Sequence, residues 1–88
     1  MGCNCNEFQR VNYLFKTYVQ NEDITAEDCN AIEFINKGAA TCSVNDLQLT
    51  TNQSLSLSGN QKDKDTSSYT LSFGAGVRQL VVIRKYLL

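Results

Sequence analysis

The sequence predicts an α+β fold, in which an N-terminal helical hairpin (about residues 7–37) packs on a four-stranded antiparallel β-sheet (about residues 43–88). Two observations lead to this prediction. Apolar residues recur with a helical period in the first part of the chain, and they alternate with polar residues in the second part. The 88 residues are enough for one domain, residues 1–88, with a core of modest size.

Residues 7–20 have the spacing of an amphipathic helix. On a helical projection one face collects Phe8, Val11, Leu14, Phe15, Tyr18 and Val19. A strand is the alternative, because Val11, Tyr13 and Phe15 occupy alternate positions. Leu14 and Tyr18 interrupt that alternation, so the pattern favours the helix.

A second helix is predicted after the polar turn at residues 21–25. Thr25 is a suitable N-cap, and Asp28 stands where a capping box has its acidic residue. The expected buried stripe consists of Ala31, Ile32, Phe34 and Ile35. Gly38 is a typical residue just beyond a helix end. Two short helices with a tight connection predict a helical hairpin.

From residue 43 onwards the apolar period changes to two, which indicates strands. The alternating apolar residues are Leu47 and Leu49, then Leu55 and Leu57, then Tyr69, Leu71 and Phe73. Residues 59–66 form a polar loop, and residues 74–76 form a turn or bulge before a last strand at residues 77–88. Together these segments predict the antiparallel sheet that the hairpin covers.

The outward side of the predicted sheet is lined with hydroxyl groups, from Ser54, Ser56, Ser58, Ser68, Thr70 and Ser72. Natural sheets commonly protect themselves with lysine, proline or inward charges, and these strands have none. The face is therefore either solvated or packed against another protein subunit. It has no aromatic platform of the kind that sugar-binding sites use.

The last strand is apolar on both faces at its centre, Leu80 to Ile83. One layer of helices cannot cover both sides of such a strand. Either loops cover its outer side, or a partner chain does. In the second case Val82, Tyr86 and Leu88 are the candidate contacts.

Four cysteines, Cys3, Cys5, Cys29 and Cys42, are the candidates for a metal site. Structural zinc sites normally use paired Cys-x₂₋₄-Cys motifs, and this chain has only one Cys-x-Cys. We therefore expect no metal and no cofactor. Cys29 and Cys42 are predicted to be small, semi-buried residues that fill space, and the N-terminal pair to be an exposed or adventitiously paired thiol site.

The opening Met1-Gly2-Cys3-Asn4-Cys5-Asn6 resembles the start of dually acylated, membrane-anchored signalling proteins. The resemblance implies myristate on Gly2 and palmitate on Cys3 and Cys5, which together would anchor a chain stably. Asn6 stands where that motif has Ser or Thr. A membrane-tethered adaptor is therefore an alternative function, as is a small binding domain stabilised by a cysteine-bound metal.

Catalysis is not expected, because the chain has no histidine and so lacks the Ser–His and Cys–His pairs of nucleophilic enzymes. It also has no glycine-rich phosphate loop. Eight Lys and Arg against nine Asp and Glu give no basic excess for nucleic acid. No apolar run is long enough for a membrane helix, so membrane binding is not expected either.

About one third of the residues are Asn, Gln, Ser or Thr, and the net charge is −1. In this composition the whole chain resembles the small virion structural proteins of tailed bacteriophages. The resemblance implies a capsid-decorating, head-fibre or neck/tail component, made in the host cytoplasm and located in the virion. Its partners would be protein subunits, including further copies of itself. The sequence thus predicts a non-catalytic structural or assembly protein.

Overall fold

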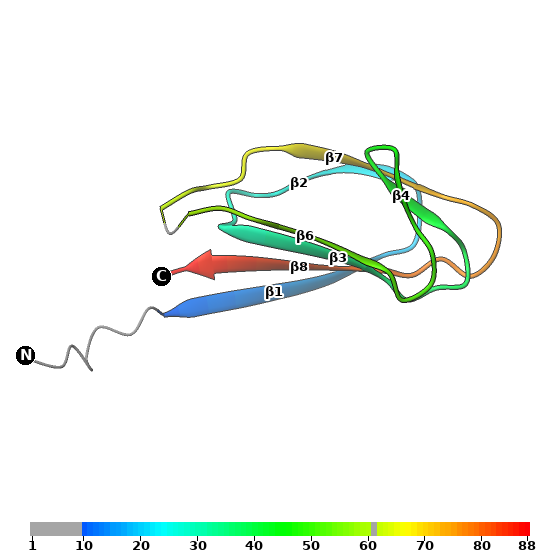
Figure 1. The fold of residues 1–88 in the computed structure, drawn as a ribbon, viewed down its shortest axis with the longest axis horizontal. Coiled ribbons are helices and arrows are strands. Elements are labelled where there is room, and N and C mark those ends of the chain that lie inside the picture. The colour runs from blue at the N-terminus through cyan, green and yellow to red at the C-terminus, as the bar shows by residue number, and fades with distance from the viewer. Residues whose placement is uncertain (1–9, 61) are drawn as a thin grey trace, which may run out of the picture.

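The structure, a computed structural model, describes residues 10–60 and 62–88. This part of the chain is all-β, with no helix (Figure 1). Its strands are β1 (Val11–Tyr18), β2 (Glu22–Thr25), β3 (Ala31–Asn36), β4 (Cys42–Val44), β5 (Leu47–Leu49), β6 (Ser54–Ser58), β7 (Ser68–Phe73) and β8 (Leu80–Leu87). The predicted α+β class is therefore wrong.

The first predicted helix is strand β1. Val11, Tyr13 and Phe15 project from one face of the strand and Leu14 from the other, so Leu14 does not interrupt the alternation but belongs to its second face. A strand with apolar residues on both faces has apolar residues at adjacent positions in the sequence. An amphipathic helix has them too. The many β-branched and aromatic residues of this segment favour a strand.

The second predicted helix is replaced by β2, a turn and β3. Glu27 and Asp28 have φ angles of 56° and 60°, in the left-handed region that no right-handed helix contains. In β3, Ile32 and Phe34 face the core while Ala31 and Ile35 face outwards. Apolar residues at positions 31, 32, 34 and 35 fit a two-sided strand as well as a helical stripe, and the period alone did not separate the two.

The four predicted strands are present as β5 to β8, although the last begins at Leu80 instead of Val77. They do not form one sheet. The first sheet has the order β1-β8-β3-β6, and the second has the order β2-β7-β4-β5. The predicted four-stranded sheet under a helical hairpin is thus replaced by two four-stranded antiparallel sheets.

The strands pair in a nested order. β1 pairs with β8, β2 with β7, β3 with β6 and β4 with β5, all antiparallel, and the pairs β3–β8 and β4–β7 complete the sheets. The chain is in effect one long hairpin wound into two sheets, which is the jelly-roll arrangement of eight strands. The tip of the hairpin is Asn45-Asp46, whose φ angles of 48° and 72° fit a type I′ turn.

The hydrophobic core lies between the two sheets. Ile32, Phe34, Leu80 and Val82 come from the first sheet, and Ile24, Val44, Leu49, Tyr69, Leu71 and Phe73 come from the second. The rings of Phe34 and Tyr69 meet edge to face with their centroids 5.0 Å apart. Because Leu80 and Val82 face this core, their neighbours Val81 and Ile83 must face away from it.

Asn36 is a buried polar residue whose side chain organises the loop after β3. Its Nδ2 donates to the carbonyl oxygens of Ala40 and Leu49, each at 2.8 Å, and its Oδ1 accepts from the N–H of Gly38 at 3.0 Å. A Cβ atom on Gly38 would overlap the carbonyl oxygen of Val77. Gly38 is therefore required for close packing of two backbone segments, and it is not the helix-terminating residue that the sequence predicted.

Candidate functional site

Strand β1 is exposed on both faces. Every residue from Val11 to Thr17 is exposed, and only Tyr18 is buried. Phe15 is 68% exposed and Tyr13 50% exposed on the outer face, while Leu14 is 48% exposed on the inner face. The second sheet therefore does not cover β1, which lies at the edge of the first sheet beside β8 (Figure 1).

The strand register continues the apolar surface of β1 across the first sheet. Phe15 lies opposite Ile83, and Thr17 lies opposite Val81, which in turn lies opposite Ile35. Residues opposite one another in an antiparallel pair project from the same face. We call this surface the outer patch and define it as Tyr13, Phe15, Ile35, Val81 and Ile83. Glu33 and Lys85 interrupt it, because they occupy the same face in β3 and β8.

The free edge of β1 includes Tyr13 and Phe15, the two residues that β1 contributes to the outer patch. The N–H of Leu88 donates to the carbonyl oxygen of Arg10 at 2.9 Å, so the even-numbered residues of β1 direct their backbone groups toward β8. The odd-numbered residues, from Val11 to Thr17, direct theirs away from the sheet. Among the described strands, none lies beyond β1 on that side. This is a long, exposed and partly apolar edge strand.

The hydroxyl face predicted from the sequence is divided between two sides of the molecule. Ser54 and Ser56 lie on β6, at the far edge of the first sheet. Ser68, Thr70 and Ser72 are the exposed residues of β7, in the second sheet. Since β6 and β7 belong to different sheets, these residues do not form one surface. Ser54 and Ser56 share the outer face of the first sheet with the outer patch, and the β7 residues do not.

The predicted contacts of the last strand point in different directions. Val82 is 0% exposed and belongs to the core, so it faces away from any partner. Tyr86 is half-buried and donates a hydrogen bond of 2.9 Å to the backbone carbonyl of Glu27. Leu88 is exposed. The exposed aromatic residues Tyr13 and Phe15 were not among the predicted contacts, although their alternation in the sequence was the signal that could have identified them.

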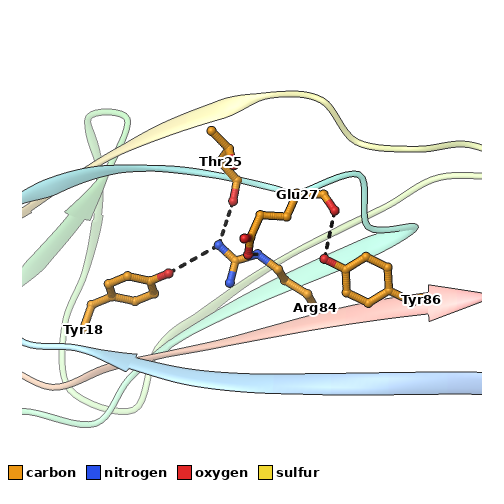
Figure 2. Close-up of polar contacts among 5 residues, drawn as sticks. All are labelled: Tyr18, Thr25, Glu27, Arg84 and Tyr86. Atoms are coloured by element: carbon orange, nitrogen blue, oxygen red, sulfur yellow. Dashed lines mark hydrogen bonds and ion pairs between the residues drawn. The ribbon is translucent and has the colours of Figure 1, made fainter.

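A second feature of the site region is a buried cation, Arg84, which is 3% exposed on the core side of β8 (Figure 2). Its Nη2 donates to the carbonyl oxygen of Thr25 at 2.6 Å and lies 3.4 Å from the hydroxyl of Tyr18. Its Nε lies 3.3 Å from a carboxylate oxygen of Glu27, close enough for an ion pair but outside hydrogen-bond geometry. Arg84 thus connects β8 to β1, to β2 and to the turn after β2.

The surroundings of Arg84 indicate a structural role. Glu27 is 61% exposed, so its side chain remains solvated while it neutralises the guanidinium. Burial, followed by the charge of Glu27, raises the pKa of Tyr86. The polar groups of this region are turned toward one another. The arrangement stabilises the contact between the sheets.

The described cysteines, Cys29 and Cys42, are free and fully buried, so they lie deeper than the semi-buried positions that the sequence predicted. Burial raises the pKa of Cys42 to about 11, and burial together with the charge of Asp65 raises the pKa of Cys29. Metal ions bind thiolates, so protonated thiols in an apolar core are poor ligands. Residues 10–60 and 62–88 contain no cluster of three potential metal ligands. Gly2, Cys3 and Cys5, the predicted acylation and thiol sites, lie outside the described residues.

A hollow of about 550 Å³ lies between the ends of β1 and β8 and the loop after β6. Its lining includes Leu14, Asp28, Lys62, Asp63 and Lys64. Two lysines and two aspartates balance one another, so the hollow favours neither an anion nor a cation. It is a less distinctive feature than the outer patch.

Comparisons with protein-family models, with curated proteins and with solved structures find no match to this chain. In the described residues there is no helix with the length and apolar character needed to cross a membrane. The class of the protein is therefore defined by its strand order, which is that of a small jelly roll. Since a jelly roll supports unrelated functions, the surface has to be the basis of any functional conclusion.

Proposed function

We propose that this chain is a non-catalytic structural or assembly protein, which binds protein subunits through the outer patch and the adjoining edge of β1. The observation that carries the proposal is the exposure of Phe15 and Tyr13, at 68% and 50%, on an edge strand whose neighbours Val81 and Ile83 continue the apolar surface. Contiguous apolar surface of this kind marks protein-binding sites.

A rough magnitude shows what the outer patch can contribute. An aromatic side chain presents about 150–250 Å² when fully exposed, so Tyr13 and Phe15 together leave roughly 200 Å² in water. Covering that area would contribute about 5 kcal/mol. This is close to the lower estimates of the entropic cost of association. A partner therefore has to use the open backbone edge or the rest of the patch in addition to the two rings.

The particular assembly that we propose is a bacteriophage virion, where the protein would decorate a capsid or join neck or tail subunits. Two observations support this assignment. The composition, neutral and rich in Asn, Ser and Thr, resembles small virion proteins. The jelly roll is a common fold of viral capsid proteins, although it also occurs in lectins and cupins. The support from the fold is an analogy at the level of architecture.

Site-specific photocrosslinking in the native host tests the proposal. A photoreactive phenylalanine analogue in place of Phe15 should give a discrete covalent adduct with a protein subunit, and mass spectrometry would identify that subunit. The matched control carries the same analogue in place of Ser72, which is exposed on the other sheet. Equal adducts from both positions, or none from position 15, would contradict the proposal.

A further inference from the structure

We infer that one partner of β1 is a second copy of this chain. In the proposed dimer the two β1 strands pair antiparallel about a two-fold axis perpendicular to the first sheet. The axis passes midway between Leu14 and the second copy's Leu14, and we call this an axis at Leu14. The two first sheets then form one continuous sheet, with β1 and the second copy's β1 at its centre. This inference rests on the proposed function, because it names an occupant of the same edge and patch.

The backbone of β1 satisfies the geometric condition for such pairing. A two-fold axis perpendicular to the sheet keeps both outer patches on the same side, so it must pair odd-numbered residues with odd-numbered residues. The odd-numbered residues are also those whose N–H and C=O groups point away from β8. The residues available for hydrogen bonding are therefore the ones whose side chains would lie together on the outer face.

The side chains select the position of the axis. With the axis at Leu14, Tyr13 faces the second copy's Phe15, and Val11 faces the second copy's Thr17. The four outward-facing residues of each strand then all have partners, and each pair exchanges two hydrogen bonds. Both Tyr13–Phe15 contacts are aromatic pairs, which are favourable across antiparallel strands.

The inner face is compatible with the same axis. Leu14 faces its own counterpart, and both copies have room there, because the second sheet leaves this side chain 48% exposed. Lys16, the charged residue of β1, faces the second copy's Asn12. An axis at Lys16 would oppose two like charges, which is destabilising. An axis at Phe15 would place Lys16 against Leu14 and would leave Val11 outside the pairing with Thr17.

The small area of this contact predicts a weak dimer. Stable interfaces bury roughly 800 Å² per partner, and one edge strand with two aromatic rings supplies clearly less. We therefore expect reversible association, with the mean mass in sedimentation equilibrium rising toward twice that of the monomer over about 1 μM to 1 mM.

Disulfide trapping tests the register directly. In a background with Cys3→Ser and Cys5→Ser, the variant Leu14→Cys places two thiols opposite each other. Leu14 would be in a non-hydrogen-bonded pair, with Cα atoms about 4.5 Å apart. That separation lies within the range that disulfides tolerate. Under mild oxidation we expect a covalent dimer as the main product.

The neighbouring positions provide matched controls. Asn12→Cys or Lys16→Cys alone should give far less covalent dimer than Leu14→Cys, whereas a mixture of the two should give the crosslinked heterodimer. Equal trapping at all three positions, or none at position 14, would overturn the inference. All three side chains are exposed, so we expect each variant to fold. Circular dichroism of each variant verifies this.

A charge exchange gives a second test that does not depend on oxidation. The double variants Tyr13→Glu/Phe15→Glu and Tyr13→Lys/Phe15→Lys should each remain monomeric, because like charges then face each other. An equimolar mixture should regain the concentration-dependent rise in mass. Failure of the mixture to associate would count against the register.

The outcomes for the two proposals can be told apart. If the probe at Phe15 gives an adduct only with a different protein and Leu14→Cys stays monomeric, the second copy is excluded and the assembly function stands. If both experiments are negative, both proposals fall.

Discussion

The guanidinium of Arg84 donates a 2.6 Å hydrogen bond to the backbone carbonyl of Thr25, which links the core side of β8 to the end of β2. These strands belong to different sheets, so the contact joins the two layers of the sandwich (Figure 2). A buried cation is costly unless it is paired and hydrogen-bonded. Here the carboxylate of Glu27 and the carbonyl of Thr25 supply both requirements.

Replacing the cation should destabilise the fold. We expect Arg84→Met to lower the free energy of unfolding by about 1–3 kcal/mol, because the carbonyl of Thr25 loses its donor. Glu27→Gln should cost less than about 1 kcal/mol, since that carboxylate is largely solvated. Urea unfolding followed by circular dichroism measures both. A larger loss for Glu27→Gln than for Arg84→Met would contradict this expectation, because it would show that a buried guanidinium without its carboxylate costs more than removal of the cation altogether.

Substitutions of Phe15 and Phe34 should differ in their effect on the free energy of unfolding, because Phe15 lies on the surface and Phe34 in the core. Phe34 is 0% exposed, so Phe34→Ala should lower the free energy of unfolding by about 3–5 kcal/mol. Phe15 is 68% exposed, so Phe15→Ser should change it by no more than about 0.5 kcal/mol. Thermal or urea unfolding of the dilute protein makes the comparison. A loss of several kcal/mol for Phe15→Ser would mean that the ring supports the monomer and would remove the main argument for the outer patch.

The turn at Asn45-Asp46 offers two substitutions with opposite expected effects. Asp46 has a φ angle of 72°, which glycine adopts without steric cost, so Asp46→Gly should stabilise the protein by up to about 1 kcal/mol. Asn45→Gly should destabilise it, because the Asn45 side chain accepts a 2.8 Å hydrogen bond from the N–H of Thr70. Melting temperatures of the two variants would give the signs, and a shift in the same direction for both would contradict the assigned roles.

The buried thiol of Cys42 should make the free energy of unfolding depend on pH in the alkaline range. Burial raises its pKa from 9.0 to about 11, so the folded state holds the proton more tightly than the unfolded state does. The resulting stabilisation is complete below the pKa of the unfolded thiol and is lost as the pH rises through about 11. We therefore expect the stability of the natural protein to fall more steeply than that of Cys42→Ala between these two values.

Tyrosine ionisation affects both proteins in that experiment, since burial and the charge of Asp65 raise the pKa of Tyr69 to about 12. Only the difference between the two stability curves therefore reports the thiol. Urea unfolding at a series of pH values measures it. Curves that run parallel above pH 9.0 would mean that Cys42 is not protected from water.

The sequence contained the apolar patterns of most strands, but for some of them the pattern did not distinguish a strand from a helix. The alternation at β6 and β7 identified these strands, because each has apolar residues on mainly one face. β8 is apolar on both faces at its centre, and its place after the turn at residues 74–76 indicated a strand. β1 and β3 carry apolar residues on both faces. A period of two and a period of 3.6 describe such short, two-sided segments almost equally well, so local pattern could not decide between helix and strand.

The candidate site depended on pairings that no local pattern contains. The sequence showed that the strand at Leu80 to Ile83 is apolar on two sides, but not which side faces the core. Pairing with β3 decided that Val82 is internal and Ile83 external. The assignment of β6 and β7 to different sheets likewise separated Ser56 from Thr70, which the sequence had placed on one face.

By itself, then, the sequence determined the polar and apolar faces of β6 and β7 and the absence of histidine from this chain. The tertiary structure decided which strands are neighbours, because the partners of β1 and β3 lie far away along the chain in β8. That choice leaves Tyr13 and Phe15 in water and encloses Arg84, since an edge strand has one neighbour and a central strand has two.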